Sequence, residues 1–164
     1  MNINRDIKKD NIFIMYSWKL KKMYEKAFYS IIDELKLAQA EADILLFLNN
    51  NKPLDTAKDI TEYRFISKSM VSKSVESLLK KGYLSCNADS TDKRSIHLII
   101  EPVAIPTVKK LLEVQKNFLS ILFKDIAEDE YEATKRVLNK INYNISSEYE
   151  DNYVEDQNGN NTRK

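Results

Sequence analysis

A short stretch in the middle of the chain concentrates side chains that suit the binding of a polyanion. Hydroxyl, thioether and ammonium groups occur together at Ser67, Lys68, Ser69, Met70, Ser72 and Lys73. A second polar cluster follows at Asp92, Lys93 and Arg94. Cationic side chains neutralise phosphates, and hydroxyl groups hydrogen-bond to base edges and phosphate oxygens. The pattern therefore favours nucleic-acid binding over covalent chemistry.

The composition argues against an enzyme. The chain has only two glycines, one histidine, His97, and one cysteine, Cys86. Phosphate-binding loops require glycines, and metal or nucleophile sites require several His, Cys or acidic groups together. We expect no catalytic residue, no metal site and no cofactor. Cys86 is expected to be a packing residue of a strand, with a redox-sensing role as the alternative.

Apolar residues that recur every three or four positions predict six helices. The expected ranges are about 10–35, 40–50, 56–64, 68–81, 106–123 and 129–146. Between the fourth and fifth helices, alternating apolar and polar residues predict a two-stranded hairpin over 83–100 with a charged tip. The polar segment 151–164 has too little apolar surface to offset its ordering entropy, so it is expected to be mobile.

The helix expected over 68–81 carries the first polar cluster. Ser67 is suited to cap its start, because the side-chain oxygen accepts a free backbone N–H, and Gly82 suits the left-handed residue that ends it. Thr56 and Asp59 form a capping pattern for the short helix before it. A buried stripe is expected at Val71, Val75, Leu78 and Leu79. The basic and hydroxyl side chains then fall on the exposed face.

The net charge of +1 conceals strong local differences. Residues 1–30 and 64–94 each carry +4 and residues 95–124 carry +2, whereas residues 31–63 carry −4 and residues 125–164 carry −5. A helix with short polar and basic side chains fits the major groove of DNA, which is about 12 Å wide. Arg94 at the hairpin tip is placed to enter the minor groove, whose negative potential attracts a guanidinium.

The segment "SKSMVSKSVESLLKKGYLSCNADSTDKRSIHLII" resembles the MarR family of winged helix-turn-helix transcriptional regulators. The resemblance extends from about Trp18 to Ile145 and includes the Asp-x-Arg wing signature at Asp92 and Arg94. By this resemblance Arg94 is the minor-groove residue and Asp92 supports the wing. The residues that it assigns to DNA contact are Ser67, Lys68, Ser69, Met70, Ser72, Lys73, Lys93 and Arg94.

The resemblance also implies a mainly α fold with a small β-hairpin wing. A winged helix-turn-helix domain would be flanked by N- and C-terminal dimerisation helices. The implied divisions are an N-terminal dimerisation helix over 1–36, a winged helix-turn-helix DNA-binding region over 37–101, C-terminal dimerisation helices over 102–150 and a flexible polar tail over 151–164. Pairing of two copies would bury the apolar faces that one winged-helix unit is too small to cover.

The implied partners are a second copy of the chain and double-stranded DNA with a pseudo-palindromic site. Two recognition helices would lie about one DNA turn, or roughly 34 Å, apart. The family favours a repressor that is released by a small aromatic or phenolic effector. Candidates for an effector pocket are Tyr16, Tyr24, Phe28 and Phe65, with core packing as the alternative for each. With neither a signal peptide nor a membrane-spanning stretch in the sequence, we expect a cytoplasmic protein.

One alternative to DNA binding stays open at this point. A winged-helix unit can instead bind another protein and no DNA. That interpretation is favoured if the exposed faces of Lys68, Lys73 and Arg94 do not converge on one surface.

Overall fold

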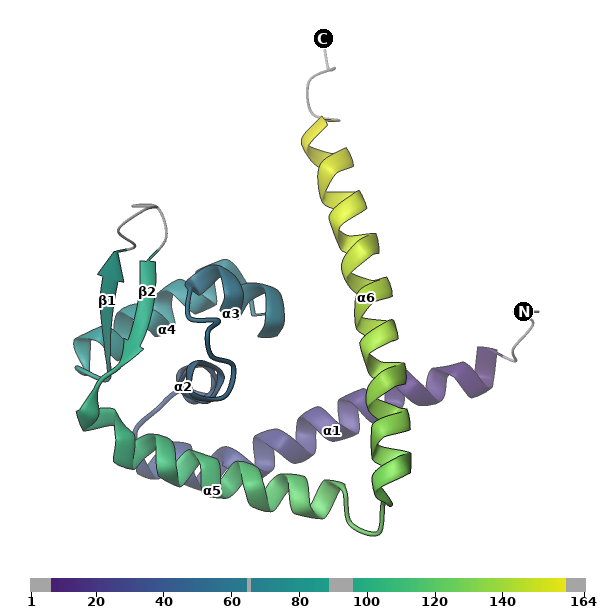
Figure 1. The fold of residues 1–164 in the computed structure, drawn as a ribbon, viewed down its shortest axis with the longest axis horizontal. Helices are drawn as coiled ribbons and strands as arrows, with labels where there is room; N and C mark the ends of the chain where they lie inside the picture. Colours follow the sequence, from purple (N-terminus) through teal and green to yellow (C-terminus); the bar gives the residue numbers. More distant parts are fainter. Residues whose placement is uncertain (1–6, 65, 89–95, 159–164) are drawn as a thin grey trace. The chain divides into compact units, whose positions relative to one another are not determined.

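A computed structural model describes residues 7–64, 66–88 and 96–158 of the chain. Its elements are α1 (Ile7–Glu34), α2 (Gln39–Asn50), α3 (Ala57–Arg64), α4 (Lys68–Lys80), β1 (Leu84–Ala88), β2 (Ile96–Ile100), a 3-10 turn η1 (Pro102–Ala104), α5 (Ile105–Leu122) and α6 (Glu128–Asn158) (Figure 1). This mainly helical fold with one antiparallel hairpin confirms the predicted fold class. The chain divides into two compact units, Met1–Leu119 and Ser120–Lys164.

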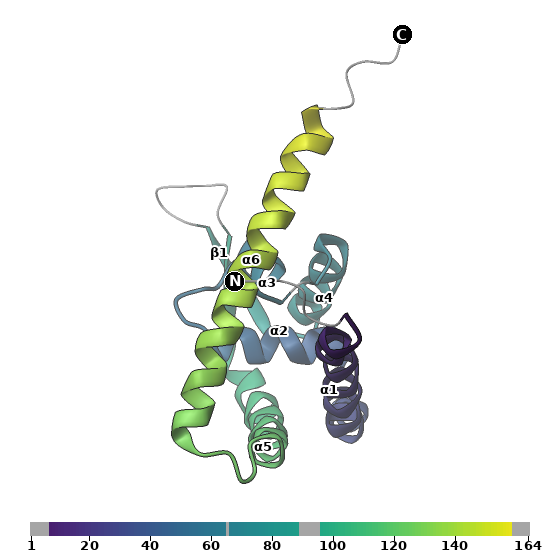
Figure 2. The ribbon, with the colours of Figure 1, turned by 90° about the vertical axis from the view of Figure 1, so that its right-hand side faces the viewer.

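In the first unit, α2 lies at the centre. The pair α1 and α5 runs along one side of α2, and α3 and α4 lie on the other side (Figures 1 and 2). Because α2 has neighbours on both sides, it is buried around most of its circumference, including all of Ile44 to Leu48. Phe28 of α1 and Leu111 of α5 are fully buried in the same hydrophobic core.

Local sequence signals explain where α3 and α4 begin and end. The hydroxyl of Thr56 accepts the backbone N–H of Asp59 at 3.1 Å, and the Asp59 carboxylate accepts the backbone N–H of Thr56 at 2.9 Å. Ser67 Oγ accepts the backbone N–H of Met70 at 3.3 Å, which caps α4. Gly82 follows α4 with φ of +69°, a left-handed conformation that favours glycine. All three predicted signals are confirmed.

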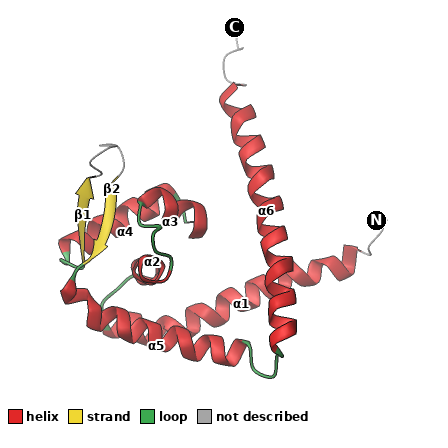
Figure 3. Cartoon of the chain, viewed as in Figure 1, coloured by secondary structure: helices red, strands yellow, loops and turns green. Residues whose placement is uncertain are grey.

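The hairpin is a two-stranded antiparallel sheet (Figure 3). Its register pairs Leu84 with Ile100 and Ala88 with Ile96. Leu98 is buried against the core, as the alternating pattern predicts, whereas Ile96 is 52% exposed near the tip. The hairpin therefore contacts the helices mainly through the end away from its tip.

The second unit contains α6, which is longer than the sequence predicts. The expected end near 146 is wrong, because the helix continues to Asn158 and so includes part of the segment expected to be mobile. No glycine or proline interrupts the chain from 129 to 158, and Gly159 follows directly after the last helical residue. The absence of a helix breaker outweighs the polar composition here.

None of the helices in the described ranges combines the length and the apolarity that a crossing of a bilayer requires.

Candidate DNA interface

The exposed face of α4 carries most of the candidate DNA-contacting residues. Val71, Ser74 and Leu78 are buried, so this stripe fixes which side of α4 turns toward the core. The predicted contact residues are all exposed: Ser67, Lys68, Ser69, Met70, Ser72 and Lys73. At about 100° of rotation per residue, Lys68 and Lys73 are about 140° apart and mark the two flanks of the exposed face.

The charge on this face is positive at the start of the helix. The first turn of α4 holds no acidic residue, and neither Lys68 nor Lys73 has an ion-pair partner within the described ranges. Near the other end, Glu76 is paired with Lys80 at 2.6 Å, which lowers the pKa of the Glu76 carboxyl. The helix N-terminus adds a partial positive charge to the two lysines. The arrangement suits an anionic partner.

The hairpin lies beside the Lys68 flank of α4. A cavity of about 700 Å³ separates the two elements, and Lys68 and Ser72 line it on one side while Cys86 and Ile96 line it on the other. Cys86 is exposed in this arrangement, so the expectation that it is a packing residue is wrong. Cys86 pairs with Leu98 in the register and lines the same cavity, so it lies on the face of the hairpin that is turned toward the helices but remains open to water there.

The residues just before α3 attach the hairpin to the helix-turn-helix unit. The backbone N–H of Leu98 donates to the carbonyl of Asp55 at 2.8 Å, and Thr56 forms an antiparallel bridge with His97. The Asp55 carboxylate also lies 2.5 Å from Nδ1 of His97. His97 thus has a structural partner that the sequence analysis missed, since residues 55 and 97 are far apart in the chain.

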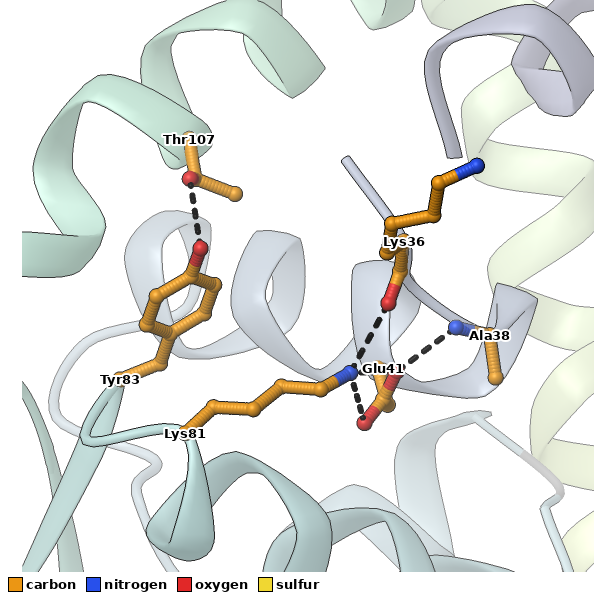
Figure 4. A network of polar contacts seen from close by, with 6 residues as sticks. All are labelled: Lys36, Ala38, Glu41, Lys81, Tyr83 and Thr107. Atoms are coloured by element: carbon orange, nitrogen blue, oxygen red, sulfur yellow. Dashed lines mark hydrogen bonds and ion pairs between the residues drawn. The ribbon is translucent and has the colours of Figure 1, made fainter. Parts of the chain in front are cut away.

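A buried ion pair holds the C-terminal end of α4 against α2 (Figure 4). Nζ of Lys81 donates to both carboxylate oxygens of Glu41 at 2.8 Å and to the carbonyl of Lys36 at 3.1 Å. Glu41 also accepts the backbone N–H of Ala38 at 2.6 Å, and its side chain is only 4% exposed. Burial alone raises the pKa of this carboxyl, but hydrogen bonds from Lys81, Ser77 and Ala38 outweigh it and hold the pKa below its ordinary value.

A second contact in the same region joins the turn after α4 to α5. The hydroxyl of Thr107 donates to the hydroxyl of Tyr83 at 3.5 Å (Figure 4). The backbone N–H of Glu101 donates to the carbonyl of Tyr83 at 3.0 Å and so closes the base of the hairpin. The orientation of α4 is therefore fixed by packing along its buried stripe and by polar contacts at its C-terminal end. These positioning contacts join residues that are far apart in the chain, so they have no signal in the sequence.

Several predicted site residues lie outside the described residues. They are Phe65, Asp92, Lys93 and Arg94. Whether Arg94 shares a surface with Lys68 and Lys73 therefore stays a prediction.

The aromatic residues considered for an effector pocket lie in different environments. Phe28 is fully buried in the core, and its ring centroid is 4.5 Å from that of Tyr24. Tyr24 also contacts Phe118 edge to face and donates its hydroxyl to Asp43 at 2.6 Å. Tyr16 is 55% exposed and lies two turns earlier on α1. Phe28 thus lies in the core, the partly buried Tyr24 packs against it, and Tyr16 is separate from them.

Comparison with known proteins agrees with the family resemblance of the sequence. Residues 35–95, which include α2, α3, α4 and β1 and end directly before β2, match the model of the MarR family. This part of the chain is therefore similar to the MarR family. Members of this family are in general transcriptional regulators and not enzymes. No curated protein matches the sequence.

Solved structures of MarR proteins share the fold over nearly the whole chain. A putative MarR family transcriptional regulator from Listeria monocytogenes, in complex with a 26mer DNA, has 17% sequence identity and a TM-score of 0.70, covering 98% of this chain and 99% of that one. A MarR protein from Peptoclostridium difficile has 19% identity and a TM-score of 0.70, covering 91% and 94%. BpsR of Bordetella bronchiseptica, described with regulation of its DNA binding by 6-hydroxynicotinic acid, has 16% identity and a TM-score of 0.62, covering 86% and 96%. At these identities the similarity establishes the MarR fold.

Proposed function

We propose that this chain is a homodimeric transcriptional repressor of the MarR family that binds a pseudo-palindromic site in double-stranded DNA. Residues 37–101 would bind DNA, and residues 1–36 and 102–150 would form the dimer. The helix α4 enters the major groove, and Arg94 in the wing enters the adjacent minor groove. Binding of a small molecule favours a dimer whose two recognition helices are spaced wrongly for one DNA turn, and so releases the DNA.

The observation that carries this proposal is the exposed face of α4. It presents two lysines without ion-pair partners in the described ranges, together with the hydroxyls of Ser69 and Ser72, at the positive end of a helix. Lysines on the flanks suit the phosphates that border a groove, and short hydroxyl side chains between them suit base edges. The DNA complex of the Listeria monocytogenes relative supports the same use of the fold.

The test begins with selection of bound sequences from a random DNA pool. We expect recovery of a palindrome with half-sites about one turn apart, because a twofold dimer presents two equivalent helices. Recovery of no preferred sequence would contradict specific DNA binding and would favour the protein-interaction alternative.

Salt dependence of binding to the selected site tests the role of the lysines. The slope of log affinity against log salt is about −0.9 for each neutralised phosphate, so each lysine replaced in both copies should reduce its steepness by about 1.8. We therefore compare Lys68→Met and Lys73→Met with Lys116→Met, an exposed lysine on α5. A slope that is equally steep in all three variants would refute the assignment of α4 as the helix whose lysines contact DNA phosphates.

The wing is tested separately by Arg94→Ala. We expect weaker binding to the selected site, because the guanidinium would contact DNA. Helicity and dimer mass should be unchanged, because Arg94 would not contact the second chain of the dimer. Asp92→Asn should give a smaller loss, since Asp92 would act only by orienting Arg94. Unchanged affinity in Arg94→Ala would overturn the wing assignment.

The dimer is supported by apolar side chains that are left exposed on the helices outside the winged-helix unit. In the first unit, Trp18 is 71% exposed and Ile14 is 54% exposed. In the second unit, Ile121 is 63% exposed and Val137 is 52% exposed. A second copy that covers such side chains would remove apolar surface from water. Sedimentation equilibrium should then give twice the 19.2 kDa chain mass at micromolar concentration; a mass of one chain would contradict the dimer.

A further inference from the structure

One pair of ionisable side chains joins the hairpin to the segment before α3. Nδ1 of His97 on β2 lies 2.5 Å from a carboxylate oxygen of Asp55. The same two segments share two backbone contacts, the 2.8 Å hydrogen bond from Leu98 to the carbonyl of Asp55 and the bridge between Thr56 and His97. The side-chain pair therefore acts where the hairpin is attached to the helix-turn-helix unit.

The strength of this contact depends on one proton. His97 is the only histidine of the chain, and an ordinary imidazole gains or loses its charge near neutral pH. When the ring is protonated, both nitrogens donate and the contact with the carboxylate is an ion pair. When the ring is neutral, one nitrogen can still donate to the carboxylate, but the ring has no charge. The contact is thus stronger in acidic solution and weaker, although not lost, in alkaline solution.

Both partners are accessible to water. The side chain of His97 is 34% exposed and that of Asp55 is 35% exposed. Protons therefore exchange with the ring without unfolding of the hairpin. Because water screens a pair with this exposure, its effect on an equilibrium constant is at most about fivefold.

The other side chains around the pair change its charge little. β1 places the uncharged Asn87 opposite His97, and α2 ends in uncharged asparagines. On α3, the carboxylate of Asp59 is occupied by the cap of that helix. Lys52 of the loop and Lys109 of α5 line a cavity that Asp55 also lines, but both lysines are exposed and screened by water. Asp55 is thus the main charged partner of the ring among the described residues.

We infer that the contact between His97 and Asp55 is proton-dependent and attaches the hairpin to the helix-turn-helix unit more firmly in acidic than in alkaline solution. The attached state favours the charged ring, so the added stability is fully present below the ordinary pKa of histidine and is lost as pH rises above it. A consequence for DNA affinity rests on the proposed function, because only a wing that contacts DNA would transmit the change. The contact itself does not rest on it and is measured without DNA.

The first test is a proton NMR titration of the full chain without DNA, in which a single histidine gives a single imidazole signal. We expect the titration midpoint to lie at a higher pH in the parent chain than in Asp55→Asn, which removes the charge and keeps the backbone contact of residue 55. Asp33→Asn removes an exposed carboxylate of α1 that pairs with Lys36, and is the matched control with the midpoint of the parent chain. Equal midpoints in the parent chain and Asp55→Asn would overturn the proposal.

Hydrogen exchange of the Leu98 amide tests whether the attachment itself responds to the proton, because this amide donates to Asp55. Exchange is compared between the parent chain and His97→Gln at about pH 6 and at about pH 8, so that the intrinsic pH dependence of exchange cancels within each pair. Protection in the parent chain should exceed that in His97→Gln by about twofold to fivefold at the lower pH and should be nearly equal at the higher pH. A ratio that is the same at both pH values would contradict the proposal.

The affinity for the selected DNA is then measured at the same two pH values and at one salt concentration. The parent chain should bind about twofold to fivefold more tightly at the lower pH, and His97→Gln should change little. Equal affinities of the parent chain at both pH values would overturn the consequence for DNA. Absence of DNA binding at either pH would contradict the proposed function, whereas the NMR and exchange results decide on the contact between His97 and Asp55 in either case.

Discussion

Replacement of Glu41 tests whether the buried ion pair holds α4 in place. The carboxylate accepts one 2.6 Å hydrogen bond from Ala38 and two 2.8 Å contacts from Lys81, and it is 4% exposed. Hydrogen bonds to charged groups contribute about 1.5–3 kcal/mol each, and glutamine keeps one acceptor oxygen but no charge. Lys81 is 34% exposed, so water partly replaces the lost partner. We therefore expect Glu41→Gln to lower the free energy of unfolding by about 2 kcal/mol at pH 7.

The assay is urea unfolding followed by circular dichroism, at one fixed protomer concentration because dimer formation adds to stability. The pKa of Glu41 is lower in the folded chain than its ordinary value. The stabilisation that the Glu41 carboxylate gives to the folded chain is therefore fully present at a pH above its ordinary pKa. It is lost as the pH falls through the lower pKa of the folded chain. The difference in free energy of unfolding between the parent chain and Glu41→Gln should stay constant as pH is lowered from 8 toward the ordinary pKa of a glutamate. It should shrink in more acidic solution.

Two comparisons make this prediction decisive. Glu76→Gln removes a carboxylate from an exposed pair with Lys80, and should leave the urea midpoint unchanged. Lys81→Met should cost more than Glu41→Gln, about 3 kcal/mol, because it leaves a buried carboxylate without its cation. The double variant should lose less than the sum of the two single losses. Equal urea midpoints for Glu41→Gln and Glu76→Gln would refute the reasoning. So would a loss of unfolding free energy in Glu41→Gln that becomes larger in acid.

Three further predictions concern the ends of α3 and α4. Ser67→Ala should lower the free energy of unfolding by about 1 kcal/mol through loss of the cap, whereas Ser69→Ala, its exposed neighbour, should change stability little. Gly82→Ala should lower the free energy of unfolding by about 1 kcal/mol, measured by the same urea titration. An added methyl group meets nothing within 4 Å, so this loss comes entirely from the left-handed φ of +69°. Asp59→Asn should cost about 1 kcal/mol at pH 7 by weakening the reciprocal cap with Thr56, and less in acid below the ordinary carboxyl pKa, because the folded pKa of Asp59 is lowered. An unchanged midpoint in any of these variants would contradict the corresponding cap.

Local signals in the sequence predicted most of the elements and the face of α4 that is exposed. The cap at Ser67, the glycine at 82 and the apolar stripe through Val71 and Leu78 all depend on interactions within a few residues, so composition and spacing are sufficient to find them. The end of α6 was misplaced because a polar segment was expected to lack order, although it contains no helix breaker before Gly159.

Contacts between distant residues had no such signal. Lys81 and Glu41 are separated by the whole of α3 and α4, and neither residue type reveals that the two are paired. The exposure of Cys86 and the engagement of His97 by Asp55 likewise depend on how the hairpin lies against its neighbours. The placement of Tyr24 and Phe28 against each other in the core is also a result of packing between helices.

The sequence by itself determined the helices, the hairpin and the concentration of basic and hydroxyl side chains on one exposed face of α4, because each of these follows from periodicity and capping along the chain. Only the tertiary structure decided how that face is held in position. The ion pair of Glu41 with Lys81 acts where α2 meets the end of α4, and its two residues come from segments that folding alone brings together.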